Sequence, residues 1–184
     1  MQPTVVDNFI SEQLAKDING YLRPKSTINP KGLISFQLHP LKINEFQDDN
    51  SKKMHKTVEF IIESIKNEFN FLNLNLEIDR VLYQVLQKGD ELGWHTDAYG
   101  GVDGYENNYF SALLYLTNDY EGGEILFYND STGDKNNSVS YKPNPGTLIY
   151  FKGDKNYPHS VNKVLSGERA NIILFFKSNK KKEA

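Results

Sequence analysis

A histidine and an aspartate stand two residues apart in the segment Trp94-His95-Thr96-Asp97. Side chains at positions i and i+2 of a β-strand project from the same face, so this imidazole and this carboxylate can point at one atom. A second histidine, His159, follows near the start of another strand-like segment. Together the three side chains would place two nitrogens and one carboxylate on one side of a metal ion, leaving its other side open. The sequence therefore predicts a metal site made of His95, Asp97 and His159.

Each of these residues also has a simpler interpretation when it is taken alone. A lone histidine is more often a hydrogen-bonded core or surface residue than a ligand, and we interpret His39 and His55 in that way. His95 and Asp97 could equally form an ion pair at the end of a strand. The metal site is favoured because His159 follows in the order expected if the two strands meet in a sandwich.

The ligand types narrow the choice of metal. Two imidazoles and one carboxylate without sulfur suit Fe(II), Mn(II) or Zn(II), and the chain has no cysteine. Zinc hydrolases usually carry both histidines on a helix in the pattern His-Glu-x-x-His, which is absent here. The His-x-His pair of the metal-binding cupins is absent as well. The sequence therefore favours iron over zinc.

An arginine follows His159 by ten residues, inside an apolar strand-like segment from Gly167 to Phe176. A buried guanidinium is very costly without a partner, so Arg169 must be paired. Its partner is either an Asp or Glu in a structural salt bridge or the carboxylate of an anionic co-substrate, which the planar fork fits well. Tyr115, in another apolar segment, either offers its hydroxyl to the same carboxylate or is a core aromatic residue.

The spacing of apolar residues predicts two helices, one over Ser11–Leu22 with Ser11 as N-cap and one from about Lys53 to Phe69. From Leu76 onward the chain consists of short β-branched or aromatic segments between Gly, Pro, Asn and Asp clusters, which is typical of a sandwich or barrel. A further short strand is expected near residues 33–38. The predicted longer strands are Ile78–Leu86, Ala112–Leu116, Glu124–Tyr128, Thr147–Phe151 and Ala170–Phe176. We therefore expect an α+β fold with a helical N-terminal part packed on a β-sandwich.

The length of 184 residues suits a single domain. Within it we expect a mainly helical part at 1–75, the β core at 76–177 and a flexible tail at 178–184. No apolar run is long enough to cross a bilayer, and the start of the chain lacks the pattern of a signal peptide, so a cytoplasmic location is expected. A net charge of −3 gives no general attraction to nucleic acid.

Several motifs occur in an order that resembles the prolyl 4-hydroxylase branch of the 2-oxoglutarate/Fe(II) dioxygenases. The resemblance covers roughly 78–176, and residues 5–11 also resemble the opening of such domains. It implies a double-stranded β-helix core, also called jelly-roll or cupin-like, with supporting N-terminal helices. The motifs are His95-x-Asp97, Leu113-Leu114-Tyr115-Leu116-Thr117, Tyr120-Glu121-Gly122-Gly123-Glu124, Pro145-Gly146-Thr147, and Pro158-His159-Ser160-Val161 leading to Arg169.

The resemblance implies roles for the same residues. His95, Asp97 and His159 would bind Fe(II) and form the catalytic centre, while Arg169 and Tyr115 would bind the far carboxylate of 2-oxoglutarate. The implied reaction consumes O2, releases succinate and CO2, and hydroxylates an unactivated C–H bond, with ascorbate as an expected reductant. Within this branch, peptidyl-proline 4-hydroxylation is the favoured reaction.

The expected partner is a peptide or protein substrate that contains proline, bound by a monomer or weak dimer. The segment Ala98–Tyr109 is interpreted either as an exposed loop or as a mobile lid over the substrate. Its aromatic residues would suit a proline-rich peptide, whose extended helix presents rings to stack on. The expected substrate contacts are Trp94, Tyr99 and Tyr109.

Some positions depart from the family pattern and keep alternatives open. Many relatives place tyrosines three and nine residues before the first histidine, where this chain has Leu92 and Leu86. The approach to His95 also resembles nucleic-acid demethylases of the same superfamily, although Phe175 and Phe176 stand where a second arginine would be expected. Demethylation of nucleic acid, hydroxylation of a free amino acid and a metal-free β-sandwich binding module are the alternatives.

Overall fold

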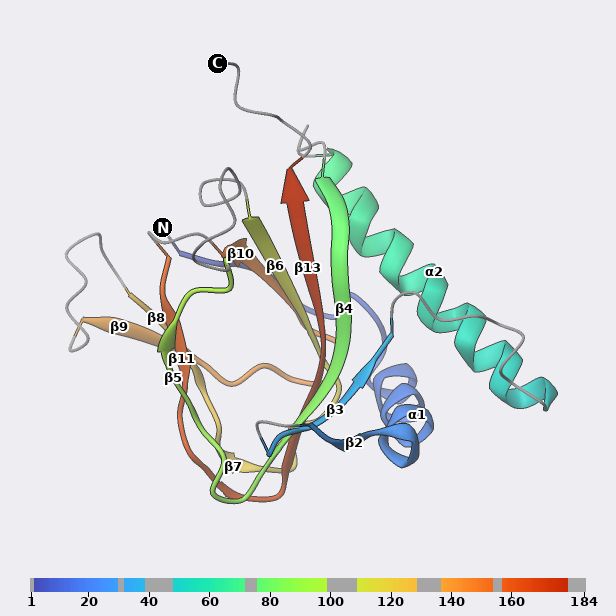
Figure 1. The fold of residues 1–184 in the computed structure, drawn as a ribbon, viewed down its shortest axis with the longest axis horizontal. Helices are drawn as coiled ribbons and strands as arrows, with labels where there is room; N and C mark the ends of the chain where they lie inside the picture. The colour runs from blue at the N-terminus through green and yellow to red at the C-terminus, as the bar shows by residue number, and fades with distance from the viewer. Residues whose placement is uncertain are drawn as a thin grey trace.

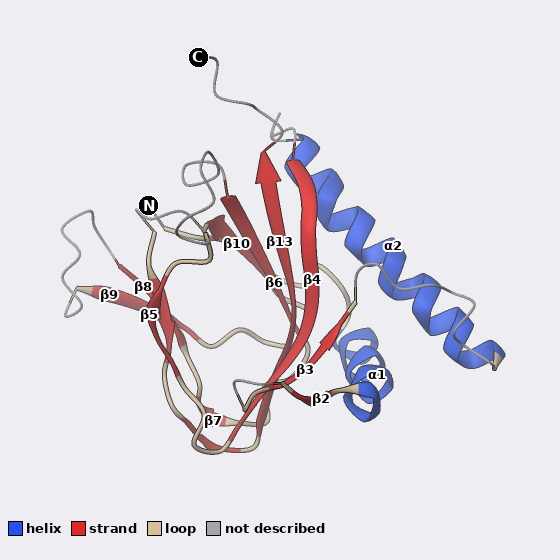
Figure 2. Ribbon diagram, in the orientation of Figure 1, coloured by secondary structure: helices blue, strands red, loops and turns tan. Residues whose placement is uncertain are grey.

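Two antiparallel β-sheets face each other in the computed structural model, and the two α-helices lie along the outer face of the larger sheet (Figures 1 and 2). The structure describes residues 2–29, 32–38, 48–71, 76–98, 109–128, 137–153 and 157–178. The helices are α1 (Glu12–Leu22), the short 3-10 helix η1 (Arg23–Lys25) and α2 (Asp49–Phe71). Within these ranges, none of the helices combines the length and the apolar character needed to cross a membrane.

The larger sheet has the order β1-β10-β6-β13-β4-β3-β2 and the smaller one the order β5-β11-β8-β9, with a separate β12-β7 pair. This arrangement confirms the predicted double-stranded β-helix core with N-terminal helices. The larger sheet consists of β1 (Thr4–Val6), β2 (Thr27–Ile28), β3 (Ile34–Gln37), β4 (Leu76–Gln87), β6 (Tyr109–Tyr115), β10 (Leu148–Lys152) and β13 (Glu168–Ser178). The other strands are β5 (Leu92–His95), β7 (Glu121–Gly122), β8 (Ile125–Tyr128), β9 (Ser138–Tyr141), β11 (His159–Val161) and β12 (Val164–Ser166).

Strand β13 lies near the centre of the larger sheet and is buried on both faces, which explains its nearly continuous apolar sequence. Because side chains alternate along a strand, one set packs under the helices and the other faces the smaller sheet. The helix-side set is Ala170, Ile172, Leu174 and Phe176, and these belong to the same core as Ile18 and Ile65. The opposite set contains Arg169, Asn171, Ile173 and Phe175, which line the cavity described below.

Both predicted helices are present, and their starts have clear causes. The Ser11 hydroxyl accepts a hydrogen bond from the Leu14 amide at 3.2 Å, as expected for an N-cap. Helix α2 begins earlier than predicted because the Asp48 carboxylate accepts a hydrogen bond from the Ser51 amide at 2.8 Å. A cap of this kind satisfies an otherwise unpaired amide of the first turn and fixes where the helix starts.

The N-terminal part also contributes strands to the larger sheet: β3 corresponds to the short strand expected near residues 33–38, and β1 and β2 were not predicted. The strand β2 pairs with the neighbouring β3, whereas β1 pairs far along the chain, with Thr4 opposite Tyr150. Local patterns carry little information about such pairings. The expected lid residues 99–108, the tail residues 179–184 and His39 lie outside the described ranges.

Candidate metal and co-substrate site

The three predicted metal ligands come together on the smaller sheet, at the ends of adjacent strands. His95 is the last residue of β5 and His159 the first of β11, and the two are direct partners across this strand pair. Asp97 was expected to share a strand face with His95, but β5 ends at His95 and Asp97 lies beyond it in a bend. The turn of the chain, rather than strand alternation, therefore brings the carboxylate to the imidazoles.

The distances within this group fit a shared metal ion. His95 Nε2 lies 3.7 Å from Asp97 Oδ1, and His159 Nε2 lies 3.6 Å from Asp97 Oδ2. One candidate ligand atom from each residue lies within 4.8 Å of the others. The side chain of His159 is 5% exposed and that of His95 is 37% exposed, so the group is closed on one side and open on the other. An ion held there would keep free positions for further ligands.

Hydrogen bonds orient two of the predicted ligands, His95 and Asp97. His95 Nδ1 lies 2.7 Å from the Gly93 carbonyl oxygen, and donation to it leaves the Nε2 lone pair facing the carboxylate. Ser111, a buried residue of β6, donates its hydroxyl to Asp97 Oδ2 at 2.6 Å. Such outer contacts fix the tautomer and direction of metal ligands. They also join Asp97 to the larger sheet, because β6 belongs to that sheet.

The third ligand is held in its neutral form by burial. Desolvation lowers the pKa of His159 to about 4, although the nearby Asp97 carboxylate acts in the opposite direction. A metal binds only a neutral imidazole, so no proton has to leave this side chain near neutral pH. The donor set, its geometry and its protonation therefore fit a divalent transition metal without a competing sulfur ligand.

Arg169 lies in the larger sheet and is almost fully buried, with 1% exposure. Its Nη2 donates to the Tyr115 hydroxyl at 2.8 Å, and its Nη1 donates to Asn171 Oδ1 at 3.4 Å. Among the described residues, Arg169 has no ion pair with an Asp or Glu. The structural salt bridge considered from the sequence is thus not found there. A buried guanidinium beside a hydroxyl is suited to an incoming carboxylate.

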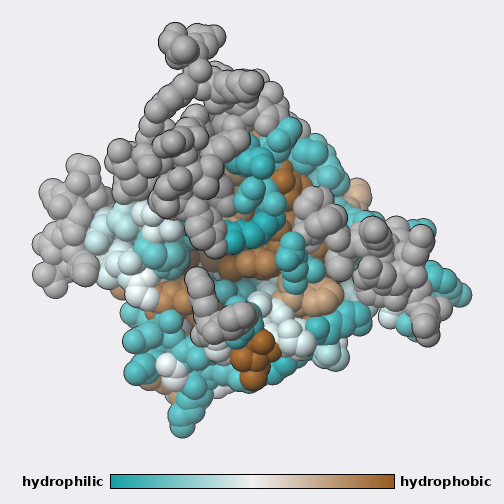
Figure 3. All heavy atoms as spheres, in the orientation of Figure 1, coloured by the Kyte–Doolittle hydropathy of each residue, from teal (hydrophilic) through white to brown (hydrophobic). Residues whose placement is uncertain are grey.

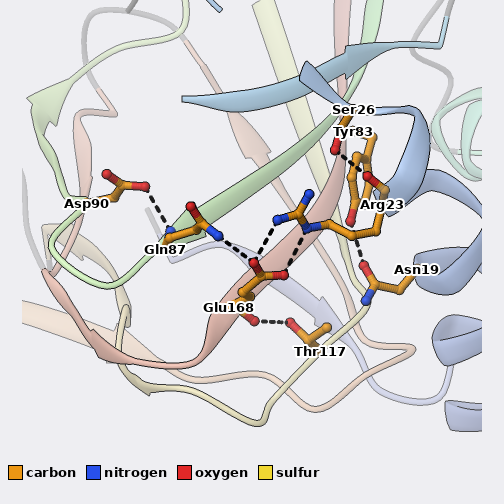
Figure 4. Close-up of polar contacts among 8 residues, drawn as sticks. All are labelled: Asn19, Arg23, Ser26, Tyr83, Gln87, Asp90, Thr117 and Glu168. Carbon is orange, nitrogen blue, oxygen red and sulfur yellow. Dashed lines mark hydrogen bonds and ion pairs between the residues drawn. The ribbon is translucent and has the colours of Figure 1, made fainter. Parts of the chain in front are cut away.

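Glu168, the residue before Arg169, is bound on the helix side of the chain (Figure 4). Arg23, which follows α1 in η1, donates to its two carboxylate oxygens from Nε at 2.9 Å and from Nη2 at 2.8 Å. Gln87 on β4 donates to the same carboxylate at 2.6 Å. The helical part and β4 are therefore both connected to the strand at the point where it carries Arg169.

Thr117, which follows β6, also holds the backbone of β13 at Arg169. Its hydroxyl donates to the Glu168 carbonyl at 2.8 Å and accepts from the Ala170 amide at 2.9 Å (Figure 4 shows the first bond). These are the two backbone groups that flank Arg169. The threonine thus continues the hydrogen bonding of the sheet just past the end of β6, and the backbone of Arg169 is held in place.

The Arg23–Glu168 ion pair predicts a pH-dependent contribution to stability. The Arg23 guanidinium, more than any other group, lowers the pKa of Glu168 from its ordinary 4.5, and Tyr83 is the other titratable group nearby. A lowered folded-state pKa stabilises the protein above the unfolded-state pKa, and this contribution disappears as the pH falls through the folded-state pKa. Glu168→Gln is therefore expected to lower the free energy of unfolding by about 0.5–1 kcal/mol near neutral pH, because the pair is about one-third exposed. Denaturant unfolding of both proteins should show this difference shrinking as the pH falls below about 4.

If the difference in the free energy of unfolding between wild type and Glu168→Gln stayed constant down to low pH, the stabilisation would not come from the Arg23–Glu168 ion pair. Lys16→Gln is a suitable control because Lys16 and Glu12 form a fully exposed pair on α1 with a distance of 2.7 Å. Exposed pairs of this kind contribute little to stability.

The metal ligands and Arg169 line one cavity of about 830 Å³ between the two sheets. Apolar side chains from the larger sheet form much of its wall, and Figure 3 shows hydrophobic surface recessed between hydrophilic margins on this face of the molecule. The cavity lies within the size range of small-ligand sites, which are mostly apolar with a few directed polar groups. The apolar wall residues are Leu82, Leu113, Ile173 and Phe175.

Two of the expected substrate residues cannot be placed. Tyr99 and the side chain of Tyr109 lie outside the described part of the chain. Trp94 does line the cavity, and its indole stacks on Tyr128 with ring centroids 4.2 Å apart and an angle of 11°. Tyr128 itself is not among the residues that line the cavity; it follows Phe127, whose ring lies 5.8 Å from that of His159, and successive side chains of a strand project from opposite faces.

Ser111, Asn171 and Tyr120 also contact or approach the site, and none of them was predicted from the sequence as a site residue. Ser111 and Asn171 could have been found by strand alternation, since Ser111 precedes Tyr115 by four residues and Asn171 follows Arg169 by two. Tyr120 is harder to anticipate because it comes from a loop. Its hydroxyl is buried, and burial raises its pKa to about 12 while Arg169 partly opposes the shift.

Comparisons with known proteins identify the family of this chain. The profile of the 2OG-Fe(II) oxygenase superfamily matches residues 81–177. Prolyl 3-hydroxylase 2 of Rattus norvegicus is 39% identical over 67 residues, which are 36% of this chain and 9% of that protein. A PKHD-type hydroxylase of Prochlorococcus marinus (strain AS9601) is 26% identical, with 93% of this chain and 78% of that protein covered.

Among solved structures, the 2OG complex of the viral collagen prolyl hydroxylase vCPH from Paramecium Bursaria Chlorella virus-1 has the same fold. Its TM-score is 0.69 at 19% identity, and the alignment covers 98% of this chain and 97% of that one. The family match spans more than half of the sequence, and its range contains His95, Asp97, His159 and Arg169. The chain belongs to the 2OG-Fe(II) oxygenase superfamily.

Proposed function

We propose that this protein is an Fe(II)- and 2-oxoglutarate-dependent dioxygenase that hydroxylates proline in a peptide or protein. The observation that carries the proposal is the placement of Arg169, a buried cation with no acidic partner in the described chain, in the same cavity as His95, Asp97 and His159. A cation opposite a metal site across one cavity suits a dicarboxylate that reaches from one to the other.

In this proposal, His95, Asp97 and His159 hold Fe(II), and Arg169 and Tyr115 bind the far carboxylate of the co-substrate. Bound iron and 2-oxoglutarate supply the oxidising chemistry, which consumes O2 and releases succinate and CO2. The protein binds and orients these groups. Its apolar wall, including Leu113 and Ile173, excludes water and strengthens the electrostatic contacts inside the cavity.

Support for a proline substrate comes from the relatives and from Trp94. The relatives with the matches described above include prolyl hydroxylases, and Trp94 lines the cavity that contains the metal ligands. Proline-rich segments adopt an extended helix with little loss of entropy and commonly dock on aromatic side chains. Tyr99 and Tyr109 are proposed as further contacts for such a peptide.

The proposed function predicts succinate formation from 2-oxoglutarate under air, dependent on Fe(II) and stimulated by proline-containing peptides. Mass spectrometry should show a gain of one oxygen atom on the peptide and none on a copy with alanine in place of proline. Free proline and a methylated single-stranded oligonucleotide, tested in parallel, distinguish the other substrate classes. Absence of succinate, together with no rise in melting temperature on adding 2-oxoglutarate with Mn(II), would contradict the oxygenase function.

A further inference from the structure

Arg169 Nε and Tyr120 Oη are buried without a hydrogen-bond partner among the described residues, and the same holds for two atoms of neighbouring side chains, Asn171 Nδ2 and Gln84 Oε1. Native proteins pair nearly all of their buried donors and acceptors, so each exception needs an explanation. Asn171 is fully buried, and both Asn171 and Gln84 line the cavity that contains the metal ligands. A ligand in that cavity is therefore a candidate for the missing partner.

Asn171 and Gln84 belong to one polar row on the cavity face of the larger sheet. Asn171 on β13 is the direct partner of Gln84 on β4 and of Tyr115 on β6. Residues directly opposite each other in antiparallel strands have Cβ atoms about 4.5–5.5 Å apart and share a face. The carboxamide of Asn171 thus lies between the Tyr115 side chain and the Gln84 carboxamide.

The guanidinium of Arg169 reaches the same row. Arg169 donates to Tyr115 through Nη2 at 2.8 Å and to Asn171 Oδ1 through Nη1 at 3.4 Å. Asn171 Oδ1 therefore points at the guanidinium, and the two N–H donors on Asn171 Nδ2 have no hydrogen-bond partner among the described residues. A carboxylate bound to Arg169 has only hydrogen-bond acceptors, so it could accept a hydrogen bond from one of these donors.

We propose that Asn171 is a further contact for the carboxylate that Arg169 binds, and that Gln84 orients Asn171. In this arrangement one Nδ2 hydrogen is donated to the carboxylate of 2-oxoglutarate and the other to Gln84 Oε1. Asn171 Oδ1 continues to accept from Arg169. The unpaired atoms of Asn171 and Gln84 then gain partners at once. This inference rests on the proposed function, since it names residues that bind the same co-substrate.

The test is the affinity for 2-oxoglutarate, measured calorimetrically with Mn(II) in place of iron so that no turnover occurs. Asn171→Leu keeps the side-chain size but removes the donors, and it is expected to weaken binding about ten-fold or more. Asn171→Asp should weaken it further because like charges repel, and Gln84→Leu should weaken it less. Affinity for Mn(II) alone should stay unchanged in all three. Binding of 2-oxobutyrate, which lacks the far carboxylate, should not differ between wild type and Asn171→Leu.

The controls separate this inference from the proposed function. If the wild-type protein does not bind 2-oxoglutarate with Mn(II), the proposed function fails. If it binds and Asn171→Leu binds equally well, or if 2-oxobutyrate is weakened as much as 2-oxoglutarate, the role of Asn171 is wrong. Asn162→Leu is the matched control because Asn162 is exposed and donates to Glu124 at 3.1 Å. Should Asn171→Leu not fold, Asn171→Ser carries the same expected loss.

Discussion

Replacing Asp97 with alanine is expected to abolish turnover while leaving the protein folded. Asp97 is the only acidic member of the predicted metal group in the described chain, and its two oxygens face the two imidazoles at 3.6 and 3.7 Å. Without it, the metal loses its one anionic ligand, and the remaining pair of neutral imidazoles binds a divalent ion weakly. Calorimetric titration with Mn(II), together with the succinate assay, measures both consequences.

Two further variants separate the loss of a ligand from a loss of structure. Asp97→Asn keeps the shape and can still accept from the Ser111 hydroxyl, which bonds Asp97 at 2.6 Å. We expect it to fold like the wild type and to have a strongly reduced Mn(II) affinity. Ser111→Ala leaves all three ligands in place and should retain much of the activity, since outer contacts tune a metal site rather than create it. Full activity in Asp97→Ala would overturn the metal assignment.

Arg169→Leu is expected to remove 2-oxoglutarate binding without destabilising the ligand-free protein. The loss of a charge-assisted pair costs about 1.5–3 kcal/mol, which corresponds to a fall in affinity of about ten-fold to more than a hundred-fold. At the same time Arg169 is a buried cation with no acidic partner in the described chain. Replacing this charge with an apolar side chain removes its desolvation cost, which offsets the loss of the hydrogen bonds to Tyr115 and Asn171. The melting temperature without ligand should therefore stay level or rise, while its increase on adding 2-oxoglutarate with Mn(II) disappears.

A structural salt bridge would give the opposite result. If Arg169 mainly paired with an acidic residue of the protein, Arg169→Leu would leave that carboxylate buried and unpaired, and the ligand-free protein would lose stability. Arg169→Lys serves as the matched variant. It keeps the charge but not the planar fork, so binding of 2-oxoglutarate should be intermediate.

The sequence predicted the fold class and several of the residues that the structure brings together in the cavity, because the relevant signals are local. The two helices have periodic apolar residues and a capping serine, and the strands alternate or are apolar throughout. His95 and Asp97 were identified by their two-residue spacing, His159 by its place near the start of a later strand, and Arg169 because a charged residue in an apolar segment needs a partner. The family resemblance then fixed the order in which the strands had to meet.

The remaining features depend on contacts that no local pattern encodes. The bond between Arg23 and Glu168 joins residues 145 positions apart, and Ser111 reaches Asp97 only because β5 and β6 lie on facing sheets. The bend that carries Asp97 past the end of β5 is likewise set by tertiary packing. Such features arise from the closing of the two sheets on each other, so they become visible only in three dimensions.

The two histidine ligands belong to the smaller sheet and Asp97 follows its strand β5, whereas Arg169 belongs to the larger sheet, which also carries the helices. Holding the metal and holding the dicarboxylate are therefore separable properties in this architecture. Sequence changes along the helix side can alter the choice or strength of the co-substrate while the metal centre is conserved. Changes at the ends of β5 and β11 can alter the metal while the anion subsite is kept. The fold thus allows the two halves of one reaction centre to diverge independently.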